Sequence, residues 1–424
     1  LDTALANGYL DARYTQSELR VSVVKKRAEI TLVLETGEQY FYGDINIEQD
    51  ILDPAFVARY VKLESGTPFD ARKLLDLHIA LSDSGYFRRV EVRIDREQAE
   101  NYHIPVTVET EPAKPRRYGA GVGFSTDTGP RLSLAAEFRR INRRGHSIMT
   151  ELRASQVRNE VGMQYRIPIK NVVTDQLVFS GKGVSEEVGD DGNSDSITLG
   201  ISQNTEWKSY HRRLYINFLQ ENFDIGEDDK RVTYLIPGAS LSRLKSDSLF
   251  YPRRGFSWTV DLRGSPGQLL SDTSFLRGEA VARAVWPLGE RSRLLLRGTA
   301  GGTSAGDFSV LPTGERFFAG GDQSVRGYDY QTLGPVDDTG EVVGGRHLLA
   351  GSIEIDRLIH GNFGAAVFVD SGNAFNDSTP DLQTGVGAGF RWRSPIGMLR
   401  IDLAHPLDDS DDKLRLHISI GPDL

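Results

Sequence analysis

The sequence contains no cysteine and only three methionines among its 424 residues. The absence of cysteine excludes a disulfide-stapled scaffold, a cysteine-ligated zinc or iron–sulfur site and a thiol nucleophile. Basic residues are outnumbered by acidic ones, 50 against 59, which gives a net charge of −9. Because a nucleic-acid-binding face normally carries a basic excess, we expect no nucleic-acid partner.

Long hydrophobic runs are also missing. No segment approaches the roughly 18 consecutive apolar residues that a membrane-spanning helix needs, and stretches such as 365–369 have the length of a strand. This pattern excludes a helical membrane protein but leaves a transmembrane barrel open, because barrel strands alternate apolar and polar residues. The chain starts at Leu1 without a signal-peptide pattern, so we expect any targeting segment to have been removed or never to have been included in this sequence.

Glycine, by contrast, is abundant, at 44 residues of 424, against a usual share of about 7%. The glycines form no collagen period and recur singly within alternating runs. Two such groups are Gly119, Gly121 and Gly123, and Gly385, Gly387 and Gly389. Isolated glycines in strands mark bends, bulges or close backbone approach, and barrels use many of them.

The first part of the chain contains a repeat with a period of about 75 residues, the size of one small α/β module. Segment 4–10 resembles 80–87, and 30–36 resembles 104–110. The second copy has the order β-α-α-β-β, with strands near 40–48, 89–95 and 104–110 and helices near 53–62 and 70–85. We therefore expect the C-terminal part of one module at 1–36 and a complete module at 37–115.

Residues 116–424 lose helical periodicity and alternate apolar with polar residues. We count roughly sixteen such segments, a spacing that fits strands of about ten residues joined by short and long loops. They lie near 117–127, 130–140, 145–156, 159–169, 175–187, 195–206, 211–223, 231–244, 254–264, 273–286, 291–301, 346–357, 362–372, 383–393, 397–405 and 413–421. We expect an all-β antiparallel transmembrane barrel of sixteen strands surrounded by lipid; a large soluble β-sandwich or propeller is the alternative.

The longest connection, about 302–345, contains the Gly-rich stretch 320–329 with Arg326. A phosphate loop is disfavoured because no Gly-Lys-Ser/Thr follows. Alternation on the next two segments points Glu354, Asp356 and Asp370 into the barrel, and a cation there needs such partners. We expect the loop to fold back and bind the wall through Arg326; a solvated surface loop is the alternative.

Two motifs carry a family resemblance. Val325-Arg326-Gly327-Tyr328, followed by Phe368-Val369-Asp370-Ser371-Gly372, resembles the signature pair of the outer-membrane assembly superfamily that is built from periplasmic POTRA modules and a 16-stranded barrel. The resemblance implies α+β POTRA modules before the barrel, outer-membrane lipid around the barrel and a loop motif docked in the lumen. The implied loop residues are Val325, Arg326, Gly327 and Tyr328, and the implied wall partners are Glu354, Asp356, Phe368, Asp370 and Gly372.

The C-terminal ending, 420–424, is similar to that of the outer-membrane subunits of the translocation and assembly module, a branch of this superfamily. That branch implies insertion or folding of other outer-membrane barrels, autotransporters among them, without enzymatic chemistry, cofactor or metal. The implied partners are client outer-membrane proteins and an inner-membrane-anchored TamB-like subunit that binds through POTRA modules in the periplasm. The branch carries three such modules, whereas this sequence has the tail of one and a complete one.

The resemblance also implies a seam between the first and last barrel strands that can open for a client. Candidate seam residues are Gly119, Gly121, Gly123, Ser419, Gly421 and Pro422. Glycine weakens the first strand and proline cannot donate a ladder hydrogen bond, so a client strand could add at this edge. The alternative is that these glycines only relieve crowding in the wall.

Other functions fit the sequence less well. The eight histidines show no metal-ligand spacing, and no Gly-x-Ser-x-Gly elbow is present for a serine hydrolase. The main alternative to an assembly factor is a transport pore, because the chain is also similar to two-partner secretion transporters, which share the plan of POTRA modules and a barrel.

Overall fold

The computed structural model describes residues 1–189, 192–248, 251–267, 270–377, 379–395, 397–408 and 414–421. The chain divides into two compact units. Unit 1 combines Leu1–Arg117 with two later segments, Phe138–Ile148 and Ile167–Val173. Unit 2 consists of Tyr118–Glu137, Met149–Arg166 and Thr174–Leu424.

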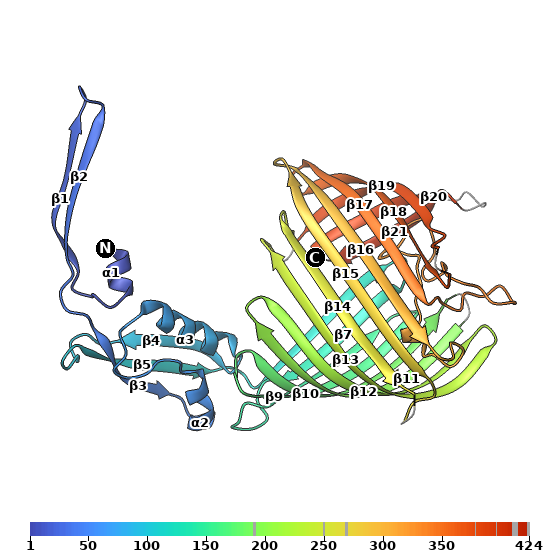
Figure 1. The fold of residues 1–424 in the computed structure, drawn as a ribbon, viewed down its shortest axis with the longest axis horizontal. Coiled ribbons are helices and arrows are strands. Elements are labelled where there is room, and N and C mark those ends of the chain that lie inside the picture. Colours follow the sequence, from blue (N-terminus) through green and yellow to red (C-terminus); the bar gives the residue numbers. More distant parts are fainter. Residues whose placement is uncertain are drawn as a thin grey trace. The chain divides into compact units, whose positions relative to one another are not determined.

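Unit 1 starts with a short helix and a hairpin and continues as a small α/β sheet (Figure 1). Its elements are α1 (Asp2–Ala6), β1 (Arg13–Ser22), β2 (Arg27–Glu35), β3 (Phe41–Glu48), α2 (Pro54–Val57), the 3₁₀ turn η1 (Ala58–Tyr60), α3 (Ala71–Asp83), β4 (Phe87–Ile94) and β5 (His103–Pro112). The sheet has the order β3-β5-β4, with β3 parallel and β4 antiparallel to β5. None of the helices in the described ranges is long and apolar enough to cross a membrane.

Both helices of this α/β sheet begin at an aspartate. Asp53 accepts a hydrogen bond from the Ala55 amide, and Asp70 accepts one from the Arg72 amide, each at 3.0 Å. An N-cap carboxylate satisfies amides that have no partner within the helix. Helix α3 then turns Leu77 and Leu81 into a core formed with the sheet, whose least exposed members are Tyr42, Leu52, Leu81, Ile104, Val106 and Val108.

The segments Phe138–Ile148 and Ile167–Val173 complete this core. The Tyr86 hydroxyl donates to the Gly145 carbonyl oxygen at 2.6 Å, and the Asp53 amide donates to the Arg143 carbonyl oxygen at 2.8 Å. Val172 is buried in the same apolar cluster. Unit 1 therefore depends on residues that follow the first barrel strand in the sequence.

Unit 2 holds a sheet of sixteen strands (Figure 1). In the pairings that the structure describes, each strand is antiparallel to the next one along the chain. This arrangement confirms the expected barrel. Its strands are β6 (Arg116–Ser125), β7 (Gly129–Phe138), β8 (Ser147–Ala154), β9 (Arg158–Pro168), β10 (Asp175–Val188), β11 (Gly192–Trp207), β12 (Tyr210–Ile225), β13 (Asp228–Ser246), β14 (Gly255–Pro266), β15 (Ser274–Leu288), β16 (Ser292–Ala305), β17 (His347–His360), β18 (Phe363–Phe375), β19 (Gln383–Ser394), β20 (Gly397–Pro406) and β21 (Arg415–Gly421). Each lies within a few residues of a segment expected from alternation.

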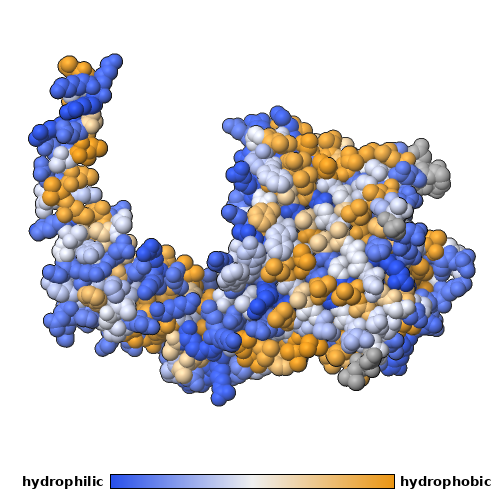
Figure 2. All heavy atoms as spheres, viewed as in Figure 1, coloured by the Kyte–Doolittle hydropathy of each residue, from blue (hydrophilic) through white to orange (hydrophobic). Residues whose placement is uncertain are grey.

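The two faces of the barrel wall differ in the expected way. On β17, Ile353 and Ile355 are exposed, while Ser352, Glu354 and Asp356 between and beside them are buried. Figure 2 shows apolar side chains over much of the outer face that is in view. Exposed apolar and buried charged side chains alternate because successive residues of a strand point to opposite faces.

The sheet order ends at β6 and β21. Between these two terminal strands, the Thr126 amide donates to the Ile418 carbonyl oxygen at 3.2 Å, and the Ile418 amide donates to the Thr126 hydroxyl at 3.1 Å. The barrel is therefore nearly closed, with a seam where its first and last strands meet.

Candidate functional site

The segment 306–346, between β16 and β17, packs against the inner wall of the barrel. It contains a short 3₁₀ turn, η2 (Thr313–Glu315), and bridges to itself between Phe317 and Gly345 and between Ala319 and Leu333. Val325 is fully buried and Tyr328 is 6% exposed, with its hydroxyl directed to the Thr384 carbonyl oxygen at 3.4 Å. This segment, which we call the lumenal loop, is therefore not a solvated surface loop.

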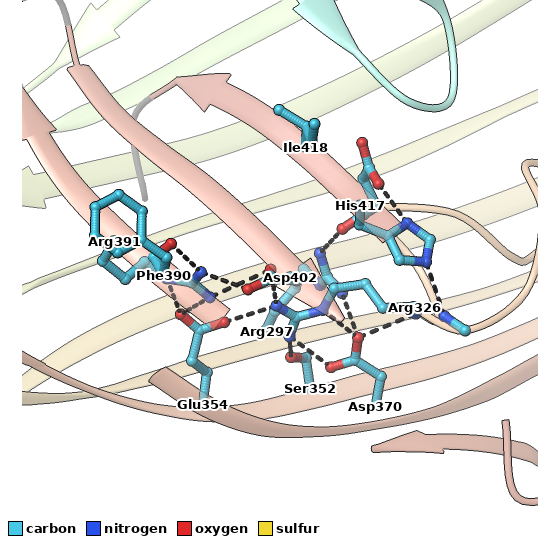
Figure 3. A network of polar contacts seen from close by, with 12 residues as sticks. Arg297, Arg326, Ser352, Glu354, Asp370, Phe390, Arg391, Asp402, His417 and Ile418 are labelled. Atoms are coloured by element: carbon cyan, nitrogen blue, oxygen red, sulfur yellow. Dashed lines mark hydrogen bonds and ion pairs between the residues drawn. The ribbon is translucent and has the colours of Figure 1, made fainter. Parts of the chain in front are cut away.

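Arg326 is the centre of the polar network that holds the lumenal loop (Figure 3). Its Nε and Nη2 donate to the two oxygens of Asp370 at 2.7 and 2.9 Å. Its Nη1 donates to Glu354 at 2.8 Å and to Asp402 at 2.9 Å. These partners come from β18, β17 and β20, so one side chain joins the loop to three strands of the wall.

The surroundings of Arg326 exclude water and fix its plane. Its guanidinium carbon lies 3.4 Å from the centre of the Phe368 ring, and its Nη2 donates to the Ser352 hydroxyl at 3.3 Å. Arg326 is 5% exposed and Asp370 is fully buried. A planar guanidinium with five donors suits this arrangement of bidentate, stacked and single contacts, which lysine could not reproduce.

Two further arginines balance the charge of the site. Arg391 donates to Glu354 at 2.7 Å and also contacts Asp402, while Arg297 lies 3.8 Å from Asp370. Three cations thus face the three carboxylates Asp370, Glu354 and Asp402. Such pairing is needed because an unpaired charge in a buried position costs several kcal/mol.

The glycines of β19 make room for this network. A Cβ atom at Gly385 would overlap the carbonyl oxygen of Arg326, one at Gly387 would overlap the Phe368 ring, and one at Gly389 would overlap the carboxylate of Asp402. The alternating glycines therefore line the wall where the loop motif approaches most closely.

Three of the five wall partners implied by the sequence lie against Arg326, namely Glu354, Phe368 and Asp370. Gly372 lies elsewhere: it pairs with Ala350 on β17, whose backbone occupies the space that a Cβ would need. Gly327 has a φ of +104° and packs on the backbone of His405 and Pro406, where a side chain would be strained.

The expectation that Asp356 contacts the loop motif is wrong. Asp356 lies opposite Arg293 on β16 and accepts a hydrogen bond from its Nε at 3.0 Å. The Arg293 guanidinium also lies 3.7 Å from the Tyr251 ring centre and donates to the Pro252 carbonyl oxygen at 2.6 Å. Inward residues of one strand are roughly 7 Å apart, so Asp356 belongs to a separate cluster.

Sequence reasoning missed Asp402, Arg391, Asp322 and His417. Asp402 lies between Ile401 and Leu403, and Arg391 lies between Phe390 and Trp392, so the same alternation that selected Asp370 would have pointed both of them inward. Asp322 offered no such signal, because it lies in the irregular part of the loop.

The described residues among those expected at the seam lie on β6 and β21. Gly121 and Gly123 face Ser133 and Arg131 on β7. Ser419 lies opposite Arg400, and Gly421 lies opposite Met398 on β20. Gly119 faces Ala135, and Pro422 lies outside the described residues.

In the described part of the chain, one group of side chains is spaced closely enough to hold a metal ion, formed by Asp127, Asp322 and His417. The His417 Nε2 accepts a hydrogen bond from the Gly327 amide at 3.0 Å, and its Nδ1 lies 2.6 Å from Asp322. Because Nε2 is an acceptor, Nδ1 carries the proton. The one remaining ring lone pair, on Nε2, already accepts from the Gly327 amide, so the group fits a hydrogen-bonded cluster better than a metal site.

Comparison with known proteins decides the family. Residues 114–423 match the Omp85 superfamily domain. The chain belongs to the Omp85 superfamily. The outer membrane protein assembly factor BamA of Nitratidesulfovibrio vulgaris is 24% identical, covering 97% of this chain and 55% of the relative. BamA of Neorickettsia risticii is 22% identical, covering 92% of this chain and 56% of the relative. The chain thus spans little more than half the length of these Omp85 relatives.

Solved structures share the fold. BamA of Haemophilus ducreyi lacking POTRA domains 1–3 superposes with a TM-score of 0.79 at 15% identity, over 99% of this chain and 91% of that one. CdiB of Acinetobacter baumannii superposes with a TM-score of 0.58 at 14% identity, over 98% and 78%. This Omp85 chain thus shares the β-barrel fold of these solved structures.

Proposed function

We propose that this Omp85 chain is an outer-membrane assembly factor that inserts or folds client β-barrel proteins, autotransporters among them. The observation that carries the proposal is the seam between β6 and β21, next to a lumenal loop anchored on β17, β18 and β20 by Arg326. The seam is the place where the wall can part while the loop keeps the remaining strands in register. No covalent step is needed.

Strand addition would drive the reaction. A terminal strand released from its seam partner presents amide and carbonyl groups without partners, which a client strand can satisfy. In the membrane interior no water can do so, and each unsatisfied group costs several kcal/mol. The glycines of β6 lower the cost of bending this strand away.

We also propose that Unit 1 contributes POTRA modules, the last of them at 37–115, which lie in the periplasm and bind partners there. Its observed order β3-α2-α3-β4-β5 supports this assignment. The C-terminal ending supports a TamA-like role with a TamB-like inner-membrane partner, whereas the curated relatives are named BamA. Restoration of autotransporter assembly in cells that lack TamA, without restoration in cells depleted of BamA, would support the TamA-like role.

The test of the seam is a reversible lock. The chain has no cysteine, so cysteines replacing Thr126 and Ile418, whose backbones are hydrogen-bonded, form the only possible disulfide. We expect the oxidised double variant to lose client insertion into vesicles and to regain it on reduction. Cysteines replacing Leu403 and Leu416, directly paired within the sheet, provide the control. Full insertion by the locked barrel would contradict the proposal.

A transport pore is the second candidate, supported by the fold similarity to CdiB. In that case the client would cross through the lumen and the lumenal loop would have to leave it. Secretion that continues in the locked 126/418 variant, together with steady conductance in planar bilayers, would favour the pore.

A further inference from the structure

Asp322 lies four residues before Arg326 and links the lumenal loop to both strands of the seam. The Thr126 hydroxyl, at the end of β6, donates to Asp322 Oδ1 at 3.2 Å. The His417 Nδ1, on β21, donates to the same oxygen at 2.6 Å. One carboxylate oxygen therefore joins the first strand, the last strand and the loop.

Thr126 and His417 each extend this link. The Thr126 hydroxyl accepts a hydrogen bond from the Ile418 amide while it donates to Asp322. The His417 Nε2 accepts from the Gly327 amide, next to Arg326 (Figure 3). The seam contact and the docked motif are thus consecutive members of one chain of hydrogen bonds.

The network is shielded from water. Asp322 is 8% exposed and His417 is 6% exposed. The Asp322 amide donates to Asp127 in the β6–β7 turn at 2.7 Å, and Arg297 on β16 donates to the carbonyl oxygens of Asp322 and Ser324. Hydrogen bonds in such a site are strong, and removing one partner leaves a buried group unsatisfied.

The two strands that meet at the seam, β6 and β21, hold the lumenal loop unequally. On the C-terminal side, Arg326 makes charge-assisted contacts to β17, β18 and β20, and Asp329 forms an ion pair with Arg415 on β21. Strands β11, β12 and β14 also hold the loop, through Thr313 and Glu315, but at β6 and its following turn the contacts in the described residues run through Thr126 and Asp127. Because β21 holds the loop through both Arg415 and His417, we expect β6 to separate from the loop when the seam parts, while β21 stays attached to it.

We propose that Thr126, Asp322 and His417 form a clasp that holds β6 to the docked lumenal loop, so that His417 and Asp322 position the loop and close this end of the seam together. The purpose of the clasp rests on the proposed function, because the clasp determines when the edge of β6 becomes available to a client strand. His417 acts as a positioning residue through its two ring nitrogens. Breaking the clasp would free β6 without undocking Arg326.

The seam distance can be measured directly. Spin labels on cysteines replacing Val122 of β6 and Leu416 of β21, both exposed on the outer face, report the separation of the two strands in the purified full chain. The native background contains no other cysteine. We expect a narrow distribution in the parent protein and a shift to longer, broader distances in Asp322→Ala, Thr126→Val and His417→Ala.

Matched variants separate the clasp from general damage. His417→Gln keeps one acceptor and one donor, so we expect it to restore the narrow distribution that His417→Ala loses. Asp338→Asn changes an exposed aspartate of the same loop and should leave the distance distribution unchanged. Heat-modifiable migration identifies folded barrels. If Asp322→Ala does not fold, the distance distribution of Thr126→Val is the deciding measurement, because that variant loses a single hydroxyl.

Three outcomes would overturn the clasp. The first is a parent-like distribution in folded Thr126→Val and His417→Ala, and the second is equal broadening in His417→Gln and His417→Ala. The third is narrowing of the parent distribution by added Zn²⁺ and its reversal by chelator, which would mean that a metal site closes the seam. Broadening in the clasp variants supports the clasp even if the locked 126/418 barrel still inserts clients, a result that would instead overturn the proposed function.

Discussion

Arg326 and Asp370 are joined by two parallel hydrogen bonds, of 2.7 and 2.9 Å, in a position where the carboxylate is fully buried. The Arg326 amide also donates to Asp370, at 3.1 Å. The pair therefore fixes the backbone of the lumenal loop as well as its side chain. The other two carboxylates that accept from Arg326, Glu354 and Asp402, are also buried.

The first prediction concerns this pair. Arg326→Ala leaves three buried carboxylates with one cation fewer, and breaking a buried pair in this way costs about 3–5 kcal/mol. We expect a barrel that forms but loses heat-modifiable migration at a lower temperature and assembles clients poorly. Arg357→Ala, an exposed arginine on β17, is the control. Equal stability of the two variants would contradict the anchoring role of Arg326.

A second prediction separates the two arginine clusters. Asp356→Ala removes the carboxylate opposite Arg293 and leaves the contacts of this arginine with Tyr251 and Pro252 in place. We expect lower thermal stability with the lumenal loop still docked. Limited proteolysis measures docking: cleavage between 306 and 346 should rise in Arg326→Ala and stay low in Asp356→Ala. Equal cleavage in both would mean that the clusters act as one.

The third prediction tests the close approach at β19. Gly385→Val places a side chain where the Arg326 carbonyl oxygen lies, so we expect the loop to be displaced and proteolysis of 306–346 to increase. At Gly298 on β16, no neighbouring atom lies within 4 Å of the place that a Cβ would occupy. Gly298→Val therefore introduces the same side chain in a strand without displacing the loop. Similar proteolysis of the two variants would refute the role of the β19 glycines.

How well the sequence predicts a structural feature depends on how far apart in the chain the interacting residues lie. Alternation is a local property, so it located all sixteen strands and the inward positions of Glu354 and Asp370. It could not identify Arg391 and Asp402 as partners of one another and of Arg326, because that requires the order and register of strands far apart in the chain. For the same reason it grouped Asp356 with the wrong arginine. The contact between Thr126 and Asp322 spans 196 residues and exists only because the sheet curls on itself.

The fourth prediction concerns pH. Asp127 lies in the turn between β6 and β7, outside the strands, and burial, followed by the nearby Asp322 carboxylate, raises its pKa from 3.8 to about 7. Because the folded state holds this proton more tightly than the unfolded state, the contribution of Asp127 to stability falls as the pH rises from about 4 to about 7. We expect the seam distribution to broaden between pH 6 and pH 8.

Asp127→Asn is the control for that experiment. It removes the titrating carboxyl but keeps the other two groups that face it, Asp322 and His417. An asparagine oxygen can still accept the hydrogen bond from the Asp322 amide. We therefore expect a narrow distribution at both pH values. A variant that broadens with pH as much as the parent would show that another group is responsible.

The fifth prediction concerns the segment Phe138–Ile148 in Unit 1. Gly145 has a φ of +74°, and a Cβ there would overlap the Phe56 ring and crowd the Tyr86 hydroxyl that donates to its carbonyl oxygen. Gly66 has a similar φ of +80° but no atom within 4 Å of that position. Gly66→Ala therefore has the backbone strain alone, about 1 kcal/mol, whereas Gly145→Ala adds the overlap.

We expect Gly145→Ala to destabilise Unit 1 clearly more than Gly66→Ala. Tyr86→Phe, which removes only the buried hydroxyl, should cost about 1 kcal/mol. Hydrogen exchange of the amides of α3 and β5 in the intact chain measures all three variants on the same core. Equal acceleration of exchange in the two alanine variants would mean that the segment around Gly145 is not held by Phe56 and Tyr86, and that the unit folds without it.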